Sequence, residues 1–224
     1  QMRQVQQLAH TNQLIATQQL DSVFQLVWKQ IPMGVELGAT DREMLELWLR
    51  FDQKYLLENN NNQHARYERA TIQRRIGQIY FAFRKLAQAQ QAYSASAQLY
   101  AELMAENGSV LSYRSELADV TVRLAWVLEE RGDAHGRDKA CEKALELVHD
   151  APTMEDYLFD SQSGMTYSSL SNLARRTGQA GKAESYLQRS IEIFNNLHER
   201  SPSNPHYRAE LERLRAKSRK PVPE

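Results

Sequence analysis

Residues 113–147 read YRSELADVTVRLAWVLEERGDAHGRDKACEKALEL, and this stretch decides the fold. Two segments rich in leucine, alanine, arginine and glutamate, which favour helix, flank the turn Gly132-Asp133-Ala134. A glycine directly after a helix commonly takes the left-handed conformation that ends it. The stretch therefore predicts a hairpin of two helices.

The rest of the chain has few helix breakers. No proline occurs between Pro32 and Pro152, and none between Pro152 and Pro202. Proline interrupts helices because it lacks an amide hydrogen, so its absence over such lengths favours continuous helix. The alternation of apolar and polar residues that is typical of strands is missing. The sequence predicts an all-α fold.

The hairpin belongs to an internal repeat. An Arg-x-Glu triplet at Arg66 recurs at Arg114 and again at Arg208, with a copy missing near Asp160, where the spacing expects one. A repeat of about 46 to 48 residues follows from these positions. The second helices of the three repeats are expected at Ala89 to Leu99, Ala140 to Leu147 and Ala183 to Ile193.

Small residues recur at three places in each repeat. The eighth place holds Gly77, Ala125 and Ser171, the twentieth Ala89, Arg137 and Ala183, and the twenty-seventh Ser96, Ala144 and Ser190. This pattern resembles the tetratricopeptide repeat (TPR) with lengthened helices, in which these places are small because helices approach closely. Arg137 departs from it, which puts close packing at the middle hairpin in doubt, and Arg84 replaces the turn glycine of the first repeat. HEAT or armadillo repeats have a similar period and are the rival interpretation.

The resemblance implies an α-α superhelix of about three long TPR-like hairpins. We expect the repeats within 63–200, at about 66–105, 112–149 and 160–199, preceded by an N-terminal helical pair with an Asn-rich linker over 1–62. Residues 201–224 are expected to form a capping helix and a basic tail, with Asn204 as the N-cap and Pro205 in the first helical position.

The N-terminal pair is predicted from two apolar stripes. Leu20, Phe24, Val27 and Ile31 have helical spacing, and Met44, Trp48, Phe51 and Tyr55 share one face of a second helix. Thr40-Asp-Arg-Glu43 has the form of a capping box at the start of that helix. The run Asn59–Asn62 is expected to end it. We expect the pair to dock on the first repeat through Met44, Trp48 and Phe51.

A second resemblance covers nearly the whole chain. A Gln-rich helix, a Pro/Gly loop, the segment EMLELWLRF (Glu43 to Phe51) and long repeats that begin with Arg-x-Glu follow one another. This order is similar to the C-terminal region of planctomycete-type membrane-anchored serine/threonine protein kinases. The resemblance implies a parent kinase in which a catalytic domain and a membrane helix precede this segment. It places the segment outside the cytoplasm.

Composition and motifs exclude several function classes. The 28 basic and 28 acidic side chains give a formal net charge of +0, so no nucleic-acid partner is expected. No apolar run has the roughly 20 residues of a membrane span. Cys141, the single cysteine, reads as a buried, inert thiol, and the scattered histidines predict no metal site. No kinase triplet, phosphate loop or nucleophile elbow is present, so we expect neither catalysis nor a cofactor.

The expected partner-binding groove follows from the TPR resemblance. In that family certain positions of each first helix face a concave groove, which a peptide or partner protein occupies. The matching residues here are Arg74, Gln78 and Phe81, then Trp126, Glu129 and Glu130, then Asn172, Arg175 and Arg176. Packing of Trp126 between neighbouring repeats is the alternative. The pattern matches the family's chaperone-tail clamp poorly.

The predicted function is a non-catalytic protein–protein interaction module whose partner the sequence does not identify. A small-ligand sensor remains an alternative, as does a region for dimerisation or spacing. A second copy of the chain is one candidate for the partner. Exposed aromatics and charges in a groove favour a peptide partner, whereas a closed pocket favours a small ligand.

Overall fold

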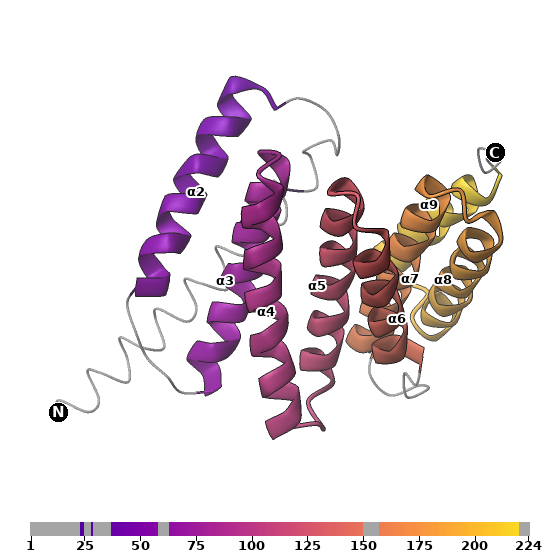
Figure 1. Cartoon of the computed structure of the whole chain (residues 1–224). Coiled ribbons are helices and arrows are strands. Elements are labelled where there is room, and N and C mark those ends of the chain that lie inside the picture. Colours follow the sequence, from indigo (N-terminus) through magenta and orange to yellow (C-terminus); the bar gives the residue numbers. More distant parts are fainter. Residues whose placement is uncertain (1–22, 25–27, 29–36, 58–62, 150–156, 220–224) are drawn as a thin grey trace, which may run out of the picture. The chain divides into compact units, whose positions relative to one another are not determined.

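The computed structural model describes residues 23, 24, 28, 37–57, 63–149 and 157–219. Over these ranges the regular elements are all α-helices and no strand occurs, which confirms the predicted all-α class. None of the described helices is long and apolar enough to cross a membrane. The elements run in the order α2 (Ala39–Leu57), α3 (Gln63–Ala82), α4 (Leu86–Glu106), α5 (Leu111–Glu130), α6 (Ala134–His149), α7 (Tyr157–Arg176), α8 (Ala180–Arg200) and α9 (Pro205–Ser218), as labelled in Figure 1.

The chain divides into two compact units. The first comprises Gln1–Asn60 with Ala82–Arg84, and the second comprises Asn61–Phe81 with Lys85–Glu224. In the second unit α3 pairs with α4, α5 with α6 and α7 with α8, while α9 packs on α8. The second helices are longer than predicted, because each begins directly after the hairpin turn and continues past the last apolar residue used to define it.

All three hairpin turns have the same backbone geometry. Arg84, Gly132 and Gly178 have positive φ angles of 59°, 77° and 71°. The amide of the following residue then donates to a carbonyl five residues earlier. These bonds run from Lys85 to Tyr80 at 2.9 Å, from Asp133 to Leu128 at 2.9 Å and from Gln179 to Ala174 at 2.8 Å. This is the Schellman ending of a helix, so the first turn takes the left-handed form without glycine.

The small residues lie where helices touch, as the repeat predicts. Gly77, Ala89, Ala125, Ala144 and Ala183 are all buried, which confirms that expectation. A Cβ atom added to Gly77 would lie 2.6 Å from ring carbons of Tyr93 on α4. Such a distance leaves no room for a side chain, so the close approach of α3 and α4 depends on glycine.

Two of the small residues also bond across their hairpins. Ser96 Oγ on α4 donates to the carbonyl of Ala70 on α3 at 2.7 Å, and Ser190 Oγ on α8 donates to the carbonyl of Gly164 on α7 at 2.8 Å. Both bonds span 26 residues and all four residues are buried. The first and third hairpins therefore share the same register.

The middle hairpin carries Arg137 at its twentieth place, where the other two hairpins have alanine. Helix α6 begins at Ala134, before Arg137. The carboxylate of Asp133 accepts a hydrogen bond from the Gly136 amide at 2.8 Å, and this contact satisfies one of the free amides at the helix start. The helix is thus fixed at its N-terminus although its twentieth place is not small.

The two predicted caps have different outcomes. Asn204 accepts from the His206 amide at 3.0 Å with Pro205 in the first turn of α9, as predicted. The capping box at Thr40 is wrong, because α2 begins at Ala39 and the Arg42 amide bonds the Gly38 carbonyl at 3.0 Å. Thr40 therefore lies inside the helix.

In the first unit, the ring of Phe24 lies 5.6 Å from that of Trp48 in an edge-to-face contact, and Phe24 is fully buried. Leu20, Val27, Ile31 and the run Asn59–Asn62 lie outside the described residues. Docking of this unit on the first repeat stays a prediction.

Candidate functional site

The first helices of the three hairpins are neighbours. Helix α3 contacts α5 through the rings of Tyr67 and Tyr113, whose centroids are 5.8 Å apart. Helix α5 contacts α7, and Glu130 forms an ion pair with Arg176 between them. The side chains of α3, α5 and α7 are therefore arranged in order along one part of the second unit.

The predicted groove residues of α3 are largely enclosed. Arg74 is 8% exposed and lies 3.7 Å from Glu116 and 3.9 Å from Asp119 on α5. Gln78 is fully buried, and Phe81 packs against the hydrophobic core. Arg74 thus ties α3 to α5, and these three residues offer little surface to a partner in this conformation.

Trp126 packs between repeats and is also partly exposed. Its ring lies against the clusters that contain Leu170 and Leu173 of α7, and the guanidinium of Arg176 lies 5.7 Å from its ring centroid. The alternative interpretation of Trp126 as a residue packed between repeats fits this position. The exposed part of the ring and the half-exposed Arg176 form one mixed aromatic and cationic surface.

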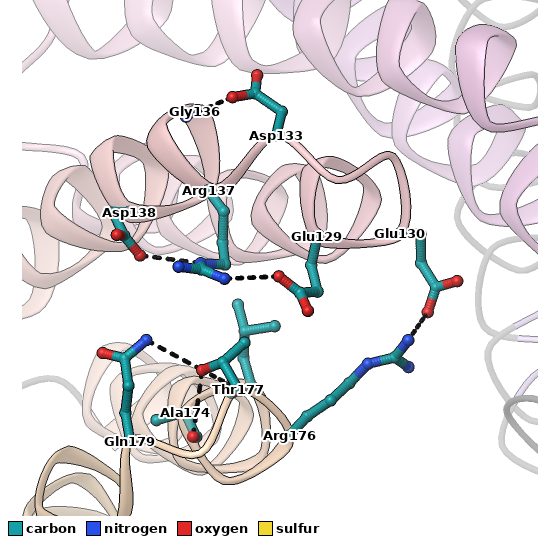
Figure 2. A network of polar contacts seen from close by, with 11 residues as sticks. Glu129, Glu130, Asp133, Gly136, Arg137, Asp138, Ala174, Arg176, Thr177 and Gln179 are labelled. Carbon is teal, nitrogen blue, oxygen red and sulfur yellow. Dashed lines mark hydrogen bonds and ion pairs between the residues drawn. The ribbon is translucent and has the colours of Figure 1, made fainter.

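The two predicted glutamates of α5 turn to different helices, as Figure 2 shows. Glu129 Oε2 accepts from Arg137 Nη1 of α6 at 2.6 Å, and Arg137 Nε donates to Asp138 at 2.8 Å. Glu130 instead meets Arg176 of α7. Hydrogen bonding to Arg137 lowers the pKa of the Asp138 carboxyl. Glu129 is therefore paired with a residue of its own hairpin, while Glu130 links two neighbouring hairpins.

Two of the three predicted residues of α7, Asn172 and Arg175, lie beside the C-terminal helix α9. Asn172 Oδ1 accepts from Lys217 Nζ of α9 at 3.2 Å. Ser168, one turn earlier, is 3.5 Å from the same amine and 3.4 Å from Arg213 Nη2. Burial, together with the nearby charges of Arg213 and Arg175, lowers the pKa of Lys217 to about 8, while Glu210 opposes this shift.

Sequence reasoning missed Lys217 and Arg213 as neighbours of the predicted groove residues and placed them only within the capping helix and basic tail of residues 201–224. The signal was present in their spacing, because residues four apart share one face of a helix. The structure brings Trp126, Glu130 and Arg176 together at the α5–α7 contact. It brings Asn172 and Arg175 to α9, and leaves Arg74, Gln78 and Phe81 on α3 among core and ion-pair contacts.

A small cavity of about 100 Å³ lies between α6, α7 and the start of α8. Its wall combines apolar side chains, among them Leu145, Leu173 and Tyr186, with Arg137 at the place where the repeat normally has a small residue. Burial raises the pKa of the Cys141 thiol to about 11, so this thiol in the cavity wall is protonated at neutral pH. Within the described ranges, no three His, Cys, Asp or Glu residues are grouped to hold a metal ion.

The comparisons place the chain in a family without assigning it an activity. No curated protein matches the chain significantly. The profile of one family, described as "Uncharacterized protein conserved in bacteria (DUF2225)", matches residues 50–205, which include helices α3 to α8 and the inter-repeat contacts described above. Because this match covers more than half of the sequence, the chain belongs to the bacterial DUF2225 family.

Proposed function

We propose that this chain is a non-catalytic interaction module, a TPR-like scaffold that binds a peptide or partner protein on the surface of α5 and α7. The arrangement of neighbouring first helices supports this function, because stacked hairpins present such helices as a continuous surface. The shared register of the Ser96 and Ser190 bonds supports a true repeat rather than an irregular bundle.

The surface around Trp126 and Arg176 carries the proposal. A half-exposed guanidinium beside an aromatic ring supplies two features common in binding hot spots, an apolar anchor and a donor for carboxylates. In the free chain Glu130 occupies Arg176. A partner carboxylate that binds Arg176 takes the place of Glu130. We therefore expect this surface to prefer acidic partners.

The resemblance to membrane-anchored kinases supplies a parent protein for this module. We propose that it serves there as the interaction region of a serine/threonine kinase, on the opposite side of a membrane from the catalytic domain. The sequence of the whole gene product tests this proposal directly. A parent without a kinase domain contradicts it and leaves the interaction module standing.

The interaction function is tested by capture of partners from a bacterial lysate with the purified chain. A double variant, Trp126→Ala with Arg176→Ala, removes the proposed surface without touching the buried ion pairs of Arg74. The matched control changes two exposed residues of the second helices, Gln91 and Arg189, to alanine. We expect the first variant to lose captured proteins that the control retains, with both folded by circular dichroism. Equal capture by the two variants contradicts the proposed surface.

The cavity at α6–α7–α8 favours a second candidate, a small-ligand sensor. Its volume of about 100 Å³ suits a compact molecule, and Arg137 and Lys182 in its wall supply polar groups beside the apolar ones. A fragment screen by NMR tests it. Binding that shifts Tyr186 and Leu173 signals and is lost on Leu173→Trp supports the sensor, whereas an absence of such fragments contradicts it.

A further inference from the structure

Helix α9 brings two cationic side chains onto a buried hydroxyl of α7. Lys217 Nζ and Arg213 Nη2 lie 3.5 Å and 3.4 Å from the same atom, Ser168 Oγ, and Ser168 is 2% exposed. Lys217 Nζ also donates to Asn172 Oδ1 at 3.2 Å. Two neighbouring positive charges therefore converge on one face of α7.

Among the described residues, Lys217 contacts no carboxylate. Both hydrogen-bond acceptors of Lys217, Ser168 and Asn172, are uncharged. The neighbouring charges that act on Lys217 are the guanidinium groups of Arg213 and Arg175 and a single carboxylate, that of Glu210, which Arg213 already binds at 2.7 Å through Nε. A partly buried ammonium beside the guanidinium of Arg213 is unfavourable unless an anion joins it.

We propose that Lys217, Arg213 and Ser168 form a binding site for a phosphoryl group carried by a partner peptide. This inference deepens the interaction function proposed above and rests on it for the source of the phosphoryl group. Lysine and arginine supply several N–H donors, and the Ser168 hydroxyl supplies one more. A phosphoryl group carries about 1.5 to 2 negative charges at pH 7 and three acceptor oxygens, so it matches the excess of positive charge better than a single carboxylate does.

The site itself is tested with inorganic phosphate as the probe, followed by NMR of the whole chain. The variants are Lys217→Met and, because Arg213 is more exposed, Arg213→Met as a second change that spares the packing of α9. The matched controls are Lys139→Met and Arg208→Met, which remove the same charges from exposed positions. We expect phosphate to shift the Lys217 signals saturably and to raise its pKa. Each site variant should weaken phosphate binding at least about tenfold, while the controls stay within about twofold.

Two results overturn the site. One is equal weakening by site and control variants, which indicates a general charge effect. The other is acetate binding as tightly as phosphate, which removes the preference for a dianion. Both results can be obtained whether or not a protein partner is known.

The source of the phosphoryl group is tested with one peptide library in three forms, with serine, glutamate or phosphoserine at the central position. Phosphoserine peptides that bind at least about tenfold tighter than inorganic phosphate, and that lose this gain on Lys217→Met, support a peptide source. If no peptide exceeds free phosphate, the site is one for the free ion and the inference about the partner is wrong. If lysate partners remain on Lys217→Met but are lost on the Trp126 double variant, only this inference fails and the interaction function stands.

Discussion

The ion pair between Asp160 and Arg200 repeats that between Arg66 and Glu106 with the charges exchanged. Arg200 Nη1 lies 3.0 Å from Asp160 Oδ2, and Arg66 binds both carboxylate oxygens of Glu106 at 2.5 and 2.6 Å. Both pairs span 40 residues and join the start of a first helix to the end of its second helix. The Arg-x-Glu copy that is missing near Asp160 is thus replaced by an inverted pair with the same position.

A charge exchange tests whether the two pairs have the same role. Asp160→Arg alone places two cations together, and Arg200→Glu alone places two anions together, so each should lower the free energy of unfolding by about 1–3 kcal/mol. The double variant copies the first hairpin and should recover part of the loss, with a coupling of about 1–2 kcal/mol. Recovery is incomplete because Arg200 also lies 4.1 Å from the ring centroid of Tyr157, a contact that glutamate does not make. Urea unfolding of all four proteins measures the coupling, and additive losses contradict it.

The turn at Arg84 predicts a stabilising change. Arg84 holds the left-handed backbone that Gly132 and Gly178 take in the other two turns, and this conformation is strained for a residue with a Cβ atom. Arg84→Gly should therefore raise the free energy of unfolding by about 0.5–1 kcal/mol relative to Arg84→Ala, which removes the side chain but keeps the strain. Thermal melts compare the two variants.

Gly132→Ala is the reverse experiment. Nothing lies within 4 Å of an added Cβ at this position, so its effect reports the backbone alone. A loss of about 1 kcal/mol is expected. If alanine is neutral at Gly132 and glycine brings no gain at residue 84, the turns do not require the left-handed form.

Gly77 tests the close approach of α3 and α4. Gly77→Ala places a methyl group 2.6 Å from the Tyr93 ring and should destabilise the chain by about 1–3 kcal/mol, although alanine favours helix. Gly181→Ala in α8 is the matched control, because no atom lies within 4 Å of its added Cβ. The control should be neutral or stabilise by up to about 1 kcal/mol. Equal effects of the two changes would contradict the packing described for Gly77.

The repeat was predictable because its signal is local. The spacing of small residues such as Ala89 and Ala183 follows from helix contacts within one hairpin, and this spacing is visible directly in the sequence. The start of α2 was missed because Thr40-Asp-Arg-Glu43 satisfies the capping pattern while the backbone enters the helix earlier, at Gly38. The start predicted by the capping pattern and the actual start of the helix differ by less than one turn. The sequence alone does not show which of them the backbone takes.

The contacts between hairpins were less predictable. Glu129 and Glu130 are neighbours in sequence, yet one bonds α6 and the other α7, because successive residues of a helix point about 100° apart. Lys217 reaches Ser168 across 49 residues, and only the packing of α9 brings them together. A position in the repeat predicts on which face of its helix a residue lies. The residue that it contacts there depends on how the helices pack.

The stability of the chain should rise with pH between about 8 and 10 through Lys217. Burial and the charge of Arg213 depress the pKa of this amine from 10.5 to about 8, so in this range the unfolded chain holds a proton that the folded chain has released. Stability rises with pH wherever the unfolded state binds more protons. Between about pH 8 and 10 the titration of Lys217 therefore increases the free energy of unfolding. It amounts to about 1–2 kcal/mol after discounting for the exposed part of the side chain.

The comparison of the natural chain with Lys217→Met isolates this contribution. Other groups act in the opposite direction over part of the range, because burial raises the pKa values of Cys141, Tyr93 and Tyr100, and these groups lose their protons more readily once unfolded. They are present in both proteins and cancel in the difference. Urea unfolding at pH 7, 8, 9 and 10 should therefore show the natural chain gaining stability relative to Lys217→Met. A difference that stays constant with pH contradicts a depressed pKa for Lys217.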